Sequence, residues 1–252
     1  MAEPLLLVEG LCKRYGGVVA TDDFSLRVAD GELCAIIGPN GAGKTTLITQ
    51  LSGELAPDSG RIVFAGRDVT RLPAHARALG GFARSFQITS IFGEFTAWQN
   101  VALAVQAQAG HSFRLWRNAS RDPALARPAL GFLEQVGLAG RAGVVATELS
   151  HGEKRALEIA MALATRPRLL LLDEPMAGMG PEESARMVAL LASLKGRLAI
   201  VLVEHDMDAV FALADRVVVL VSGRVIAAGS SDEVRADAGV RKAYLGEGDQ
   251  PC

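Results

Sequence analysis

Short hydrophobic runs bounded by turn residues dominate both ends of the chain. Near the start, Leu33–Ile37 lies between an Asp-Gly pair and a glycine-rich turn, and Arg61–Phe64 follows the sequence Pro-Asp-Ser-Gly. Runs of this length that end at turn residues predict β-strands. The last third of the chain returns to short runs rich in valine, leucine and isoleucine, separated by segments with helical spacing. This alternation is typical of a parallel sheet that is buried on both faces.

The middle of the chain has a different pattern. From about residue 88 to 165, segments rich in alanine and leucine, such as Thr96–Ala109 and Leu125–Val136, have helical spacing. We therefore predict one α/β domain that spans the whole chain. Its core comprises about residues 1–87 and 166–252, and the helical region between them is an inserted subdomain.

Composition excludes several classes of protein. The chain has 252 residues, of which 50% are hydrophobic, and a formal net charge of -2, so it has no basic excess and we expect no nucleic-acid partner. Its cysteines, Cys12, Cys34 and Cys252, are far apart and form no Cys-x-x-Cys pair, which argues against a disulfide framework or a zinc site. Its hydrophobic runs are far shorter than the roughly 20 residues that cross a bilayer. The first ten residues do not resemble a secretory signal.

A glycine-rich segment joins the predicted strand Leu33–Ile37 to a predicted helix. Small residues there let successive backbone N–H groups surround phosphates, and the helix N-terminus adds partial positive charge. Lys44 would reach the β- and γ-phosphates of a nucleotide, and the Thr45 hydroxyl would bind Mg²⁺. A glycine-rich turn without a ligand is the alternative, but the strand and helix on either side favour a phosphate loop. The nine residues of the segment are Gly38, Pro39, Asn40, Gly41, Ala42, Gly43, Lys44, Thr45 and Thr46.

Two carboxylates, Asp173 and Glu174, end the hydrophobic run Leu169–Leu172. In doubly wound sheets, ligands bind beyond the carboxyl ends of the strands. Asp173 would hold Mg²⁺ through water, and Glu174 could orient and polarise the water that attacks a γ-phosphate. An acidic pair after a strand is by itself more often an ordinary turn, but the phosphate loop upstream favours the catalytic interpretation.

The segment Leu149–Glu153 precedes a predicted helix whose apolar residues recur at helical spacing. Ser150 and Glu153 have the spacing of a capping box. A capped helix N-terminus can also bind an anion, so Ser150 and Gly152 are candidate ligands of a phosphate. A well-capped helix without a ligand explains the pattern equally well.

Two further polar residues lie at element ends. Gln87 stands where the strand-rich pattern gives way to the helical one, and His205 follows the hydrophobic run Leu198–Val203. Taken singly, a glutamine at such a place is usually a surface residue, and a histidine is more often structural than catalytic.

In combination, these segments resemble the motifs of ABC ATPases, in the order that this family has them. The resemblance extends from Tyr15 to about Gly246 and implies a P-loop ATPase core with a parallel sheet, an antiparallel β subdomain and an inserted helical subdomain. The matching segments are the phosphate loop Gly38–Thr46, Gln87 of the Q-loop, the signature Leu149–Glu153, Leu172–Pro175 of Walker B, and Glu204–Asp206 of the H-loop.

The resemblance also implies how ATP and Mg²⁺ are bound. ATP lies between the phosphate loop of one subunit and Ser150 and Gly152 of another, in a head-to-tail dimer. His205 then contacts the γ-phosphate, Gln87 links the nucleotide to a membrane partner, and Tyr15 stacks on adenine. On this basis the catalytic candidates are Glu174, His205 and Gln87, and the candidate metal ligands are Thr45, Gln87 and Asp173.

Further segments resemble the ATP-binding subunits of branched-chain amino acid importers, and Gly110–Arg127 resembles the longer of the two ATPases that such importers usually pair. His151 agrees with this subgroup, which commonly has an aromatic residue at that place in the signature. Gly180 departs from it, because the subgroup has asparagine and the family generally has aspartate there. We expect this departure to weaken communication across the dimer. The resembling segments are Lys13–Gly17, Ala83–Gln87, Glu174–Met179 and Ala243–Gly246.

The function implied is that of an ATPase subunit bound peripherally to the cytoplasmic face of the bacterial inner membrane. It would couple ATP hydrolysis to the uptake of branched-chain or other hydrophobic amino acids. Its partners would be membrane-embedded permease subunits, a second ATPase subunit, identical or different, and indirectly an external solute-binding protein. The alternatives are an ATPase of the lipopolysaccharide-export type and a non-transport ABC ATPase that acts on cytosolic partners. A nucleotide kinase is disfavoured, because nothing resembles a lid for a second substrate.

We expect the permease to dock near Gln87, on an apolar and aromatic surface. The alternative is that these residues fill the core of the helical subdomain. Three arginines in the same region are more consistent with a solvated face than with a phospholipid contact. The surface residues are Ile88, Ile91, Phe92, Phe95 and Trp98, and the arginines are Arg114, Arg117 and Arg121.

Overall fold

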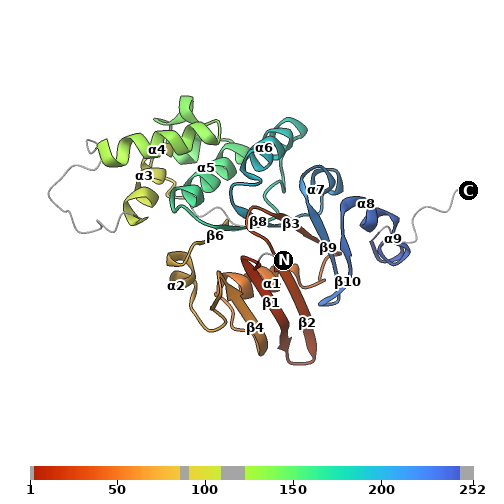
Figure 1. Ribbon diagram of the computed structural model, residues 1–252. Coiled ribbons are helices and arrows are strands. Elements are labelled where there is room, and N and C mark those ends of the chain that lie inside the picture. Colours follow the sequence, from red (N-terminus) through yellow and green to blue (C-terminus); the bar gives the residue numbers. More distant parts are fainter. Residues whose placement is uncertain (1–2, 86–90, 109–122, 245–252) are drawn as a thin grey trace, which may run out of the picture.

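The computed structural model describes residues 3–85, 91–108 and 123–244, and it contains two sheets of different kinds (Figure 1). The smaller sheet is antiparallel. Its strands, in spatial order, are β2 (Val18–Val28), β1 (Leu6–Tyr15), β4 (Ser59–Phe64) and β5 (Arg67–Asp68).

The larger sheet has five parallel strands and an antiparallel strand, β10, at one edge. In spatial order its strands are β10 (Arg224–Gly229), β9 (Arg216–Val221), β3 (Leu33–Ile37), β8 (Ala199–Val203), β7 (Leu169–Asp173) and β6 (Phe82–Arg84). The parallel sheet, the antiparallel sheet and the helical region confirm the predicted fold class.

Helices cover the larger sheet and form the helical region. Helices α3, α4 and α5 gather at one end of the molecule, and α8 and α9 lie at the other end (Figure 1). The helices are α1 (Lys44–Ser52), α2 (Ala74–Leu79), α3 (Ala97–Gln108), α4 (Pro123–Gln135), α5 (His151–Ala164), α6 (Pro181–Leu194), α7 (Met207–Leu213), α8 (Ser231–Ala236) and α9 (Ala238–Tyr244), with 3-10 turns at Ala139–Arg141 and Ala146–Glu148.

Strand β7 shows why the strands of the larger sheet are continuous hydrophobic runs in the sequence. Side chains of a strand point alternately to its two faces. Leu169 and Leu171 join the hydrophobic cluster that contains the buried face of α1 and the smaller sheet. Leu170 and Leu172 join the opposite cluster, which contains buried residues of α6. Both faces of the strand are therefore covered from Leu169 to Leu172, which explains the unbroken hydrophobic run before Asp173.

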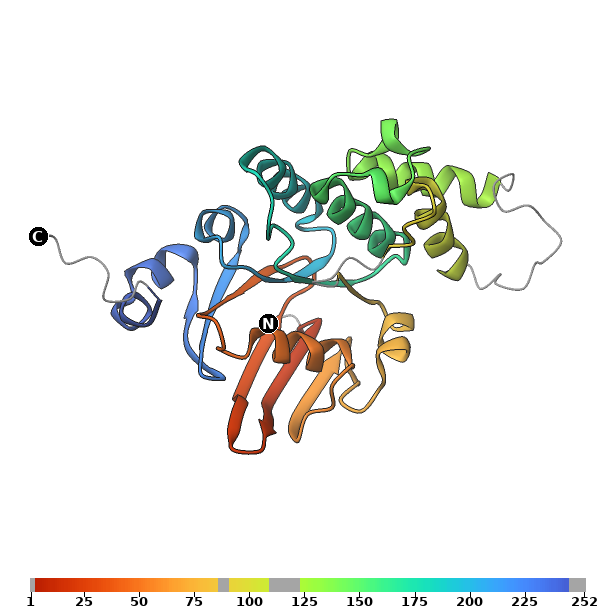
Figure 2. The ribbon, with the colours of Figure 1, turned by 180° about the vertical axis from the view of Figure 1, so that it is seen from behind.

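Helix α1 lies between the two sheets, as the view from behind shows (Figure 2). Its C-terminal end is held by Arg77 of α2, which is fully buried. Burial lowers the pKa of the Arg77 guanidinium to about 10, so the group stays charged at neutral pH. Its N–H groups donate to the carbonyl oxygens of Gln50 (2.8 Å), Leu51 (2.6 Å), Leu72 (3.0 Å) and Thr70 (3.0 Å).

The helical region has a hydrophobic cluster of its own, to which α3, α4 and α5 contribute. Ile91 and Trp98 pack against this cluster. Phe92 and Phe95 stack on each other with ring centroids 5.5 Å apart and are 54% and 39% exposed. The residues expected at a permease surface thus divide between the core of the helical region and its surface. Ile88 and the arginines at 114, 117 and 121 lie outside the described residues.

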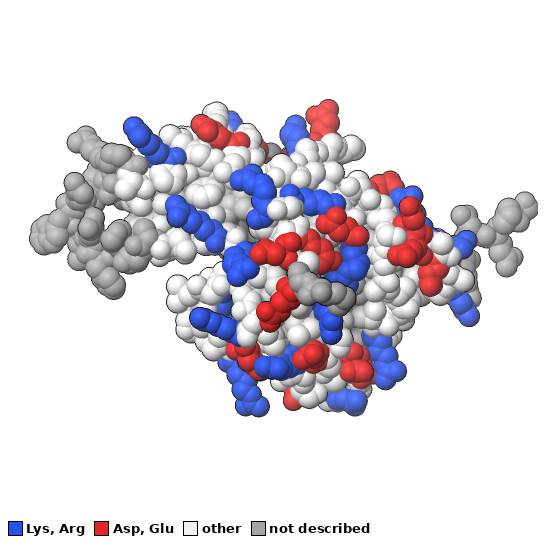
Figure 3. All heavy atoms as spheres, in the orientation of Figure 1, with Lys and Arg blue, Asp and Glu red and all other residues white. Residues whose placement is uncertain are grey.

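None of the helices in the described ranges combines the length and the apolar character that crossing a bilayer requires. The face of the molecule in Figure 3 carries acidic and basic side chains intermixed, in keeping with the formal net charge of -2. On this face, no broad patch of one sign is available to attract a polyanion.

We predict that Leu47→Ala lowers the free energy of unfolding by about 2–5 kcal/mol, because it leaves a cavity between α1 and the two sheets. Leu79→Ala is the matched control. Leu79 is 83% exposed, so the same truncation there should cost less than about 0.5 kcal/mol. Urea denaturation of both variants measures the difference, and equal losses would contradict the proposed packing of α1.

Candidate functional site

Two glycines allow the phosphate loop to pass close to neighbouring backbone. A Cβ atom at Gly38 would lie 2.1 Å from the carbonyl oxygen of Leu220 in β9. A Cβ atom at Gly43 would lie 2.0 Å from the carbonyl oxygen of Ala20 in β2, and Gly43 has a φ of 102°. Any side chain would collide at either position, and at Gly43 it would also strain the backbone. The loop therefore runs in direct contact with both sheets.

The loop leads into α1 with an open N-terminus. Gly43 is the N-cap residue and makes no side-chain hydrogen bond to the helix, and the first turn contains no acidic residue. Lys44 donates from Nζ to the carbonyl oxygens of Gly38 (2.7 Å) and Pro39 (3.1 Å). Burial lowers the pKa of Lys44, while the charges of Glu174 and Asp173 act in the opposite direction. The lysine and both carboxylates therefore share one electrostatic environment.

Asp173 ends β7 and is only 1% exposed. Within the described part of the chain, neither of its carboxylate oxygens has a hydrogen-bond partner, and Nη2 of Arg84 lies 3.6 Å from Oδ2. Burial raises the pKa of Asp173, and the positive charge of Arg84 is the largest opposing influence. A buried carboxylate with unsatisfied oxygens is costly unless a cation or water completes its shell. Asp173 therefore has the properties of a ligand to a hydrated cation.

Glu174 follows directly in a left-handed backbone conformation, with a φ of 49°. Its N–H donates to the carbonyl oxygen of Val203, 2.8 Å away at the end of β8. Such a conformation costs about 1–3 kcal/mol for a residue other than glycine and is often found at functional sites. The hydrogen bond across to β8 holds the strained residue beside the strand that leads to His205.

His205 follows β8, and its side chain is 60% exposed. The preceding residue, Glu204, is fully buried, and burial raises its pKa. The Glu204 carboxylate accepts hydrogen bonds from the N–H groups of Met176 (2.8 Å) and His205 (3.0 Å). It therefore ties the segment after β7 to the segment after β8. The sequence pattern predicts a role for His205 alone at this place, although an ionisable residue that continues a hydrophobic run is a usable signal for Glu204 as well.

Strand order explains how these groups come together. β3, β8 and β7 are adjacent and parallel, so their carboxyl ends meet at one edge of the sheet. The phosphate loop follows β3, His205 follows β8, and Asp173 ends β7. The resulting edge combines an open helix N-terminus, a lysine, two carboxylates and a histidine.

The signature lies at the start of α5. Ser150 is the N-cap of α5, and its capping box with Glu153 is confirmed: Glu153 N–H donates to Ser150 Oγ (3.2 Å), and Ser150 N–H donates to Glu153 Oε2 (2.8 Å). His151 Nε2 lies 3.0 Å from the carbonyl oxygen of Ala177, in the segment after β7. Among the described residues, no hydrogen bond joins the signature to the phosphate loop of the same chain.

Of three other predicted residues, two lie in the described part of the chain. Tyr15 ends β1 and is 52% exposed, with Lys13 Nζ 5.8 Å from its ring centroid. Gly180 is the N-cap of α6, and a Cβ atom there would meet nothing within 4 Å. Gln87 lies outside the described residues.

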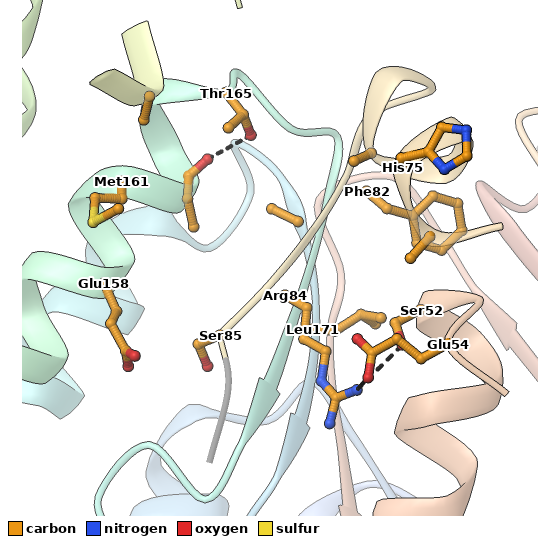
Figure 4. Close-up of a pocket in the computed structure, with 15 residues that line it drawn as sticks. Ser52, Glu54, His75, Phe82, Arg84, Ser85, Glu158, Met161, Thr165 and Leu171 are labelled. Atoms are coloured by element: carbon orange, nitrogen blue, oxygen red, sulfur yellow. Dashed lines mark hydrogen bonds and ion pairs between the residues drawn. The ribbon is translucent and has the colours of Figure 1, made fainter. Parts of the chain in front are cut away.

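A groove of about 390 Å³ opens between α2, β6 and α5, and most of its wall is apolar (Figure 4). Its polar margin includes Arg84, whose Nη1 donates to Glu54 (2.7 Å) and to Ser52 Oγ (3.2 Å). Ser85, two residues before Gln87, also lines the groove. The apolar lining includes Ala74, Ala78, Phe82, Ala104, Met161, Ala162 and Leu171.

Comparison with known proteins supplies independent information. The family described as ABC transporter matches residues 21–177, and the family described as branched-chain amino acid ATP-binding cassette transporter matches residues 224–250. The chain is 38% identical to the high-affinity branched-chain amino acid transport ATP-binding protein BraF of Pseudomonas aeruginosa, over 98% of this chain and 100% of BraF. It is 34% identical to the lipopolysaccharide export system ATP-binding protein LptB of Acidithiobacillus ferridurans, over 96% of this chain and 97% of LptB.

Among solved structures, the chain is similar to the ADP conformation of an ATP-binding cassette of an ABC transporter. The TM-score is 0.85 at 29% identity, and the match covers 98% of this chain and 100% of that chain.

We predict that Gly38→Ala destabilises the protein by about 1–3 kcal/mol, because the new methyl group displaces either the loop or β9. ATP binding should weaken in parallel, since the loop moves. Gly140→Ala is the control, because a Cβ atom there meets nothing within 4 Å. Thermal unfolding and titration with a fluorescent ATP analogue measure both effects. Unchanged ATP binding by Gly38→Ala would show that the close approach to β9 does not shape the phosphate site.

Proposed function

Because this chain belongs to the family of ABC transporter ATP-binding proteins, we propose that it is the ATP-hydrolysing subunit of an importer for branched-chain or other hydrophobic amino acids. One observation carries the ATPase assignment: the open N-terminus of α1 lies beside the buried Asp173 and the adjoining Glu174 at one sheet edge. The cargo class rests on similarity along the whole chain to BraF and on the C-terminal match.

In this proposal the phosphate loop binds the phosphates of ATP. The backbone N–H groups of residues 38–46 surround the phosphates, and the partial positive charge of α1 attracts them. Lys44 exchanges its bonds to two loop carbonyls for contacts with the β- and γ-phosphates. Tyr15, exposed at the end of β1, stacks on the adenine.

Mg²⁺ would be held by Thr45, Asp173 and Gln87. The unsatisfied, buried oxygens of Asp173 fit a hydrated cation. Among the described residues, no group of three or more histidines, cysteines or carboxylates could hold a metal by itself. This fits Mg²⁺, which usually binds one or two protein ligands together with substrate phosphates. When bound, the ion neutralises phosphate charge.

For hydrolysis, we propose direct attack of water on the γ-phosphate. Glu174 orients this water and accepts its proton, because its carboxylate follows Asp173 directly and its charge acts on Lys44 of the phosphate loop. His205 contacts the γ-phosphate and is held by the hydrogen bond from its N–H to buried Glu204. Gln87 completes the catalytic group.

Among the described residues, neither Ser150 nor Gly152 forms a hydrogen bond with the phosphate loop of its own chain, and this supports a shared site. We propose that they contact ATP bound to an opposing ATPase subunit in a head-to-tail dimer. Each subunit then carries two half-sites, the phosphate loop and the signature. ATP bound between the subunits joins the phosphate loop of one to the signature of the other. Gly180, at the start of α6, offers no side chain to this interface, and we infer that communication between the two sites is weakened.

We propose that a permease segment docks in the groove between α2, β6 and α5 (Figure 4). The groove is mostly apolar and lies between the core, about residues 1–87 and 166–252, and the helical subdomain, about residues 88–165. Docking there would place the subunit on the cytoplasmic face of the inner membrane. It would also place the permease beside Ser85, two residues before Gln87 in the sequence.

The lipopolysaccharide-export alternative is less well supported, because identity to LptB is 34%, against 38% to BraF, and the C-terminal match is to the branched-chain family. A non-transport role on cytosolic partners predicts that no membrane-embedded protein co-purifies with the chain.

We predict that the wild type releases phosphate from Mg-ATP and that Glu174→Gln does so at least about a hundredfold more slowly, because it lacks the proton acceptor. The variant should instead accumulate as an ATP-bound dimer. Phosphate release and size-exclusion chromatography in ATP measure the two effects, with Glu134→Gln as a control at an exposed site. Equal turnover by wild type and Glu174→Gln would remove Glu174 as the base. Absence of turnover in both would mean that the isolated chain needs its partner subunits.

We predict that Ala78→Glu abolishes co-purification with membrane-embedded partners, because it places a charge in the apolar groove. Ala236→Glu is the control, on exposed α8 at the opposite end of the molecule (Figure 1). Both variants should still bind ATP, since neither residue belongs to the nucleotide site. Mass spectrometry of affinity-purified membrane extracts identifies the partners. Full retention of the permease by Ala78→Glu would place docking elsewhere.

A further inference from the structure

A carboxylate from α6 lies over the signature. Ser150 Oγ donates a hydrogen bond to Oε1 of Glu183, 3.0 Å away. The same carboxylate also lies close to Gly152, because a Cβ atom there would be 2.7 Å from both Cδ and Oε1 of Glu183. Glu183 thus covers both residues proposed to receive a nucleotide from the opposing subunit.

The contact uses the only proton that the Ser150 hydroxyl can donate. The hydroxyl already accepts the N–H of Glu153 in the capping box, so its O–H is the remaining donor. This O–H points to Glu183. A phosphate oxygen can receive that hydrogen bond only if Glu183 releases it.

Electrostatics explain why the carboxylate is found there. Glu183 lies next to the N-terminus of α5, where the partial positive charge attracts anions. The other carboxylate at this place, Glu153, forms an ion pair with Arg141 at 3.0 Å. In the described part of the chain, Glu183 forms no ion pair. Its charge is compensated by the helix N-terminus and by the Ser150 hydroxyl.

A cavity of about 430 Å³ adjoins this contact and is lined by Ser150, Gly152, Glu183 and Arg186, among others. The carboxylate can therefore turn away from Ser150 without unfolding α6. The arginine on the next turn of α6 offers a positive charge toward which it can move.

We propose that Glu183 sets the ATP concentration at which two subunits close, by competing with the γ-phosphate for the Ser150 hydroxyl and the N-terminus of α5. The inference rests on the proposed function, in which Ser150 and Gly152 contact ATP bound to the opposing subunit. Glu183 lowers the affinity of the shared site in two ways. It occupies the hydrogen-bond donor, and its negative charge repels the triphosphate.

Glu182 provides a matched control. It lies in the same first turn of α6, is exposed, and makes no hydrogen bond to the signature among the described residues. Both carboxylates belong to the first turn of α6, where acidic side chains stabilise a helix. A role limited to stabilising α6 would therefore give Glu182→Gln and Glu183→Gln the same effect.

The experiment measures dimer formation against ATP concentration in the Glu174→Gln background, where hydrolysis does not dissipate the dimer. Analytical ultracentrifugation gives the midpoint, which is the ATP concentration at which half of the protein is dimeric. The dimer can be formed with a second copy of the chain or with a partner ATPase that co-purifies. Glu183→Gln should lower the midpoint about three- to tenfold, because the amide oxygen is uncharged and accepts a weaker hydrogen bond from the Ser150 hydroxyl than the carboxylate does. Glu182→Gln should leave the midpoint unchanged.

A double-mutant cycle tests the mechanism. If competition for the hydroxyl is the cause, Glu183→Gln should lower the midpoint by a smaller factor when Ser150→Ala is also present. The inference is overturned if the Glu174→Gln protein dimerises with ATP and the added Glu183→Gln leaves the midpoint unchanged or raises it. The proposed function would then still stand. A Glu174→Gln protein that forms no ATP-dependent dimer, alone or with its partner ATPase, overturns the shared site and the inference together.

Discussion

The backbone of the phosphate loop passes within van der Waals contact of two different sheets, and the rest of the structure depends on this close approach. Gly38 meets the carbonyl of Leu220 in the parallel sheet, and Gly43 meets the carbonyl of Ala20 in the antiparallel sheet. The loop therefore packs directly against both sheets. Helix α1 continues from the loop into the space between the sheets, and Arg77 binds the carbonyl groups at its other end. Nucleotide binding and the packing of the two sheets therefore share one set of contacts.

Features that depend on nearby residues could be predicted from the sequence. The pattern predicts a helix over Thr96–Ala109, and the structure has α3 at Ala97–Gln108. The capping box at Ser150 was predictable because its two residues are three positions apart. The contacts of Glu183 and Glu204 were not, because their partners lie 33 and 28 residues away in the chain. Their positions follow from how α5, α6 and the strands pack, which no local pattern encodes.

In the candidate site, too, some features could be predicted from nearby residues and others depend on tertiary packing. The phosphate loop, the acidic pair and His205 could be predicted because each follows a hydrophobic run of strand length, and the resemblance to ABC ATPases gave the order of the motifs. Their convergence follows from the strand order β3-β8-β7, which places three segments far apart in sequence at one edge. The burial of Asp173 and its contact with Arg84, which also binds Glu54 in the groove, required tertiary structure. The roles of all the candidate site residues, Gln87 and Tyr15 included, stay predictions.

The left-handed backbone of Glu174 has a consequence for how this position can vary. With a φ of 49°, the residue most compatible with the backbone is glycine, which lacks the carboxylate that the proposed chemistry needs. Replacement by glycine should therefore increase thermal tolerance while removing turnover, a trade-off between stability and activity confined to one residue. Selection for robustness alone would drive this position toward glycine. A glutamate at this position therefore keeps a strained backbone together with the carboxylate that the proposed chemistry uses.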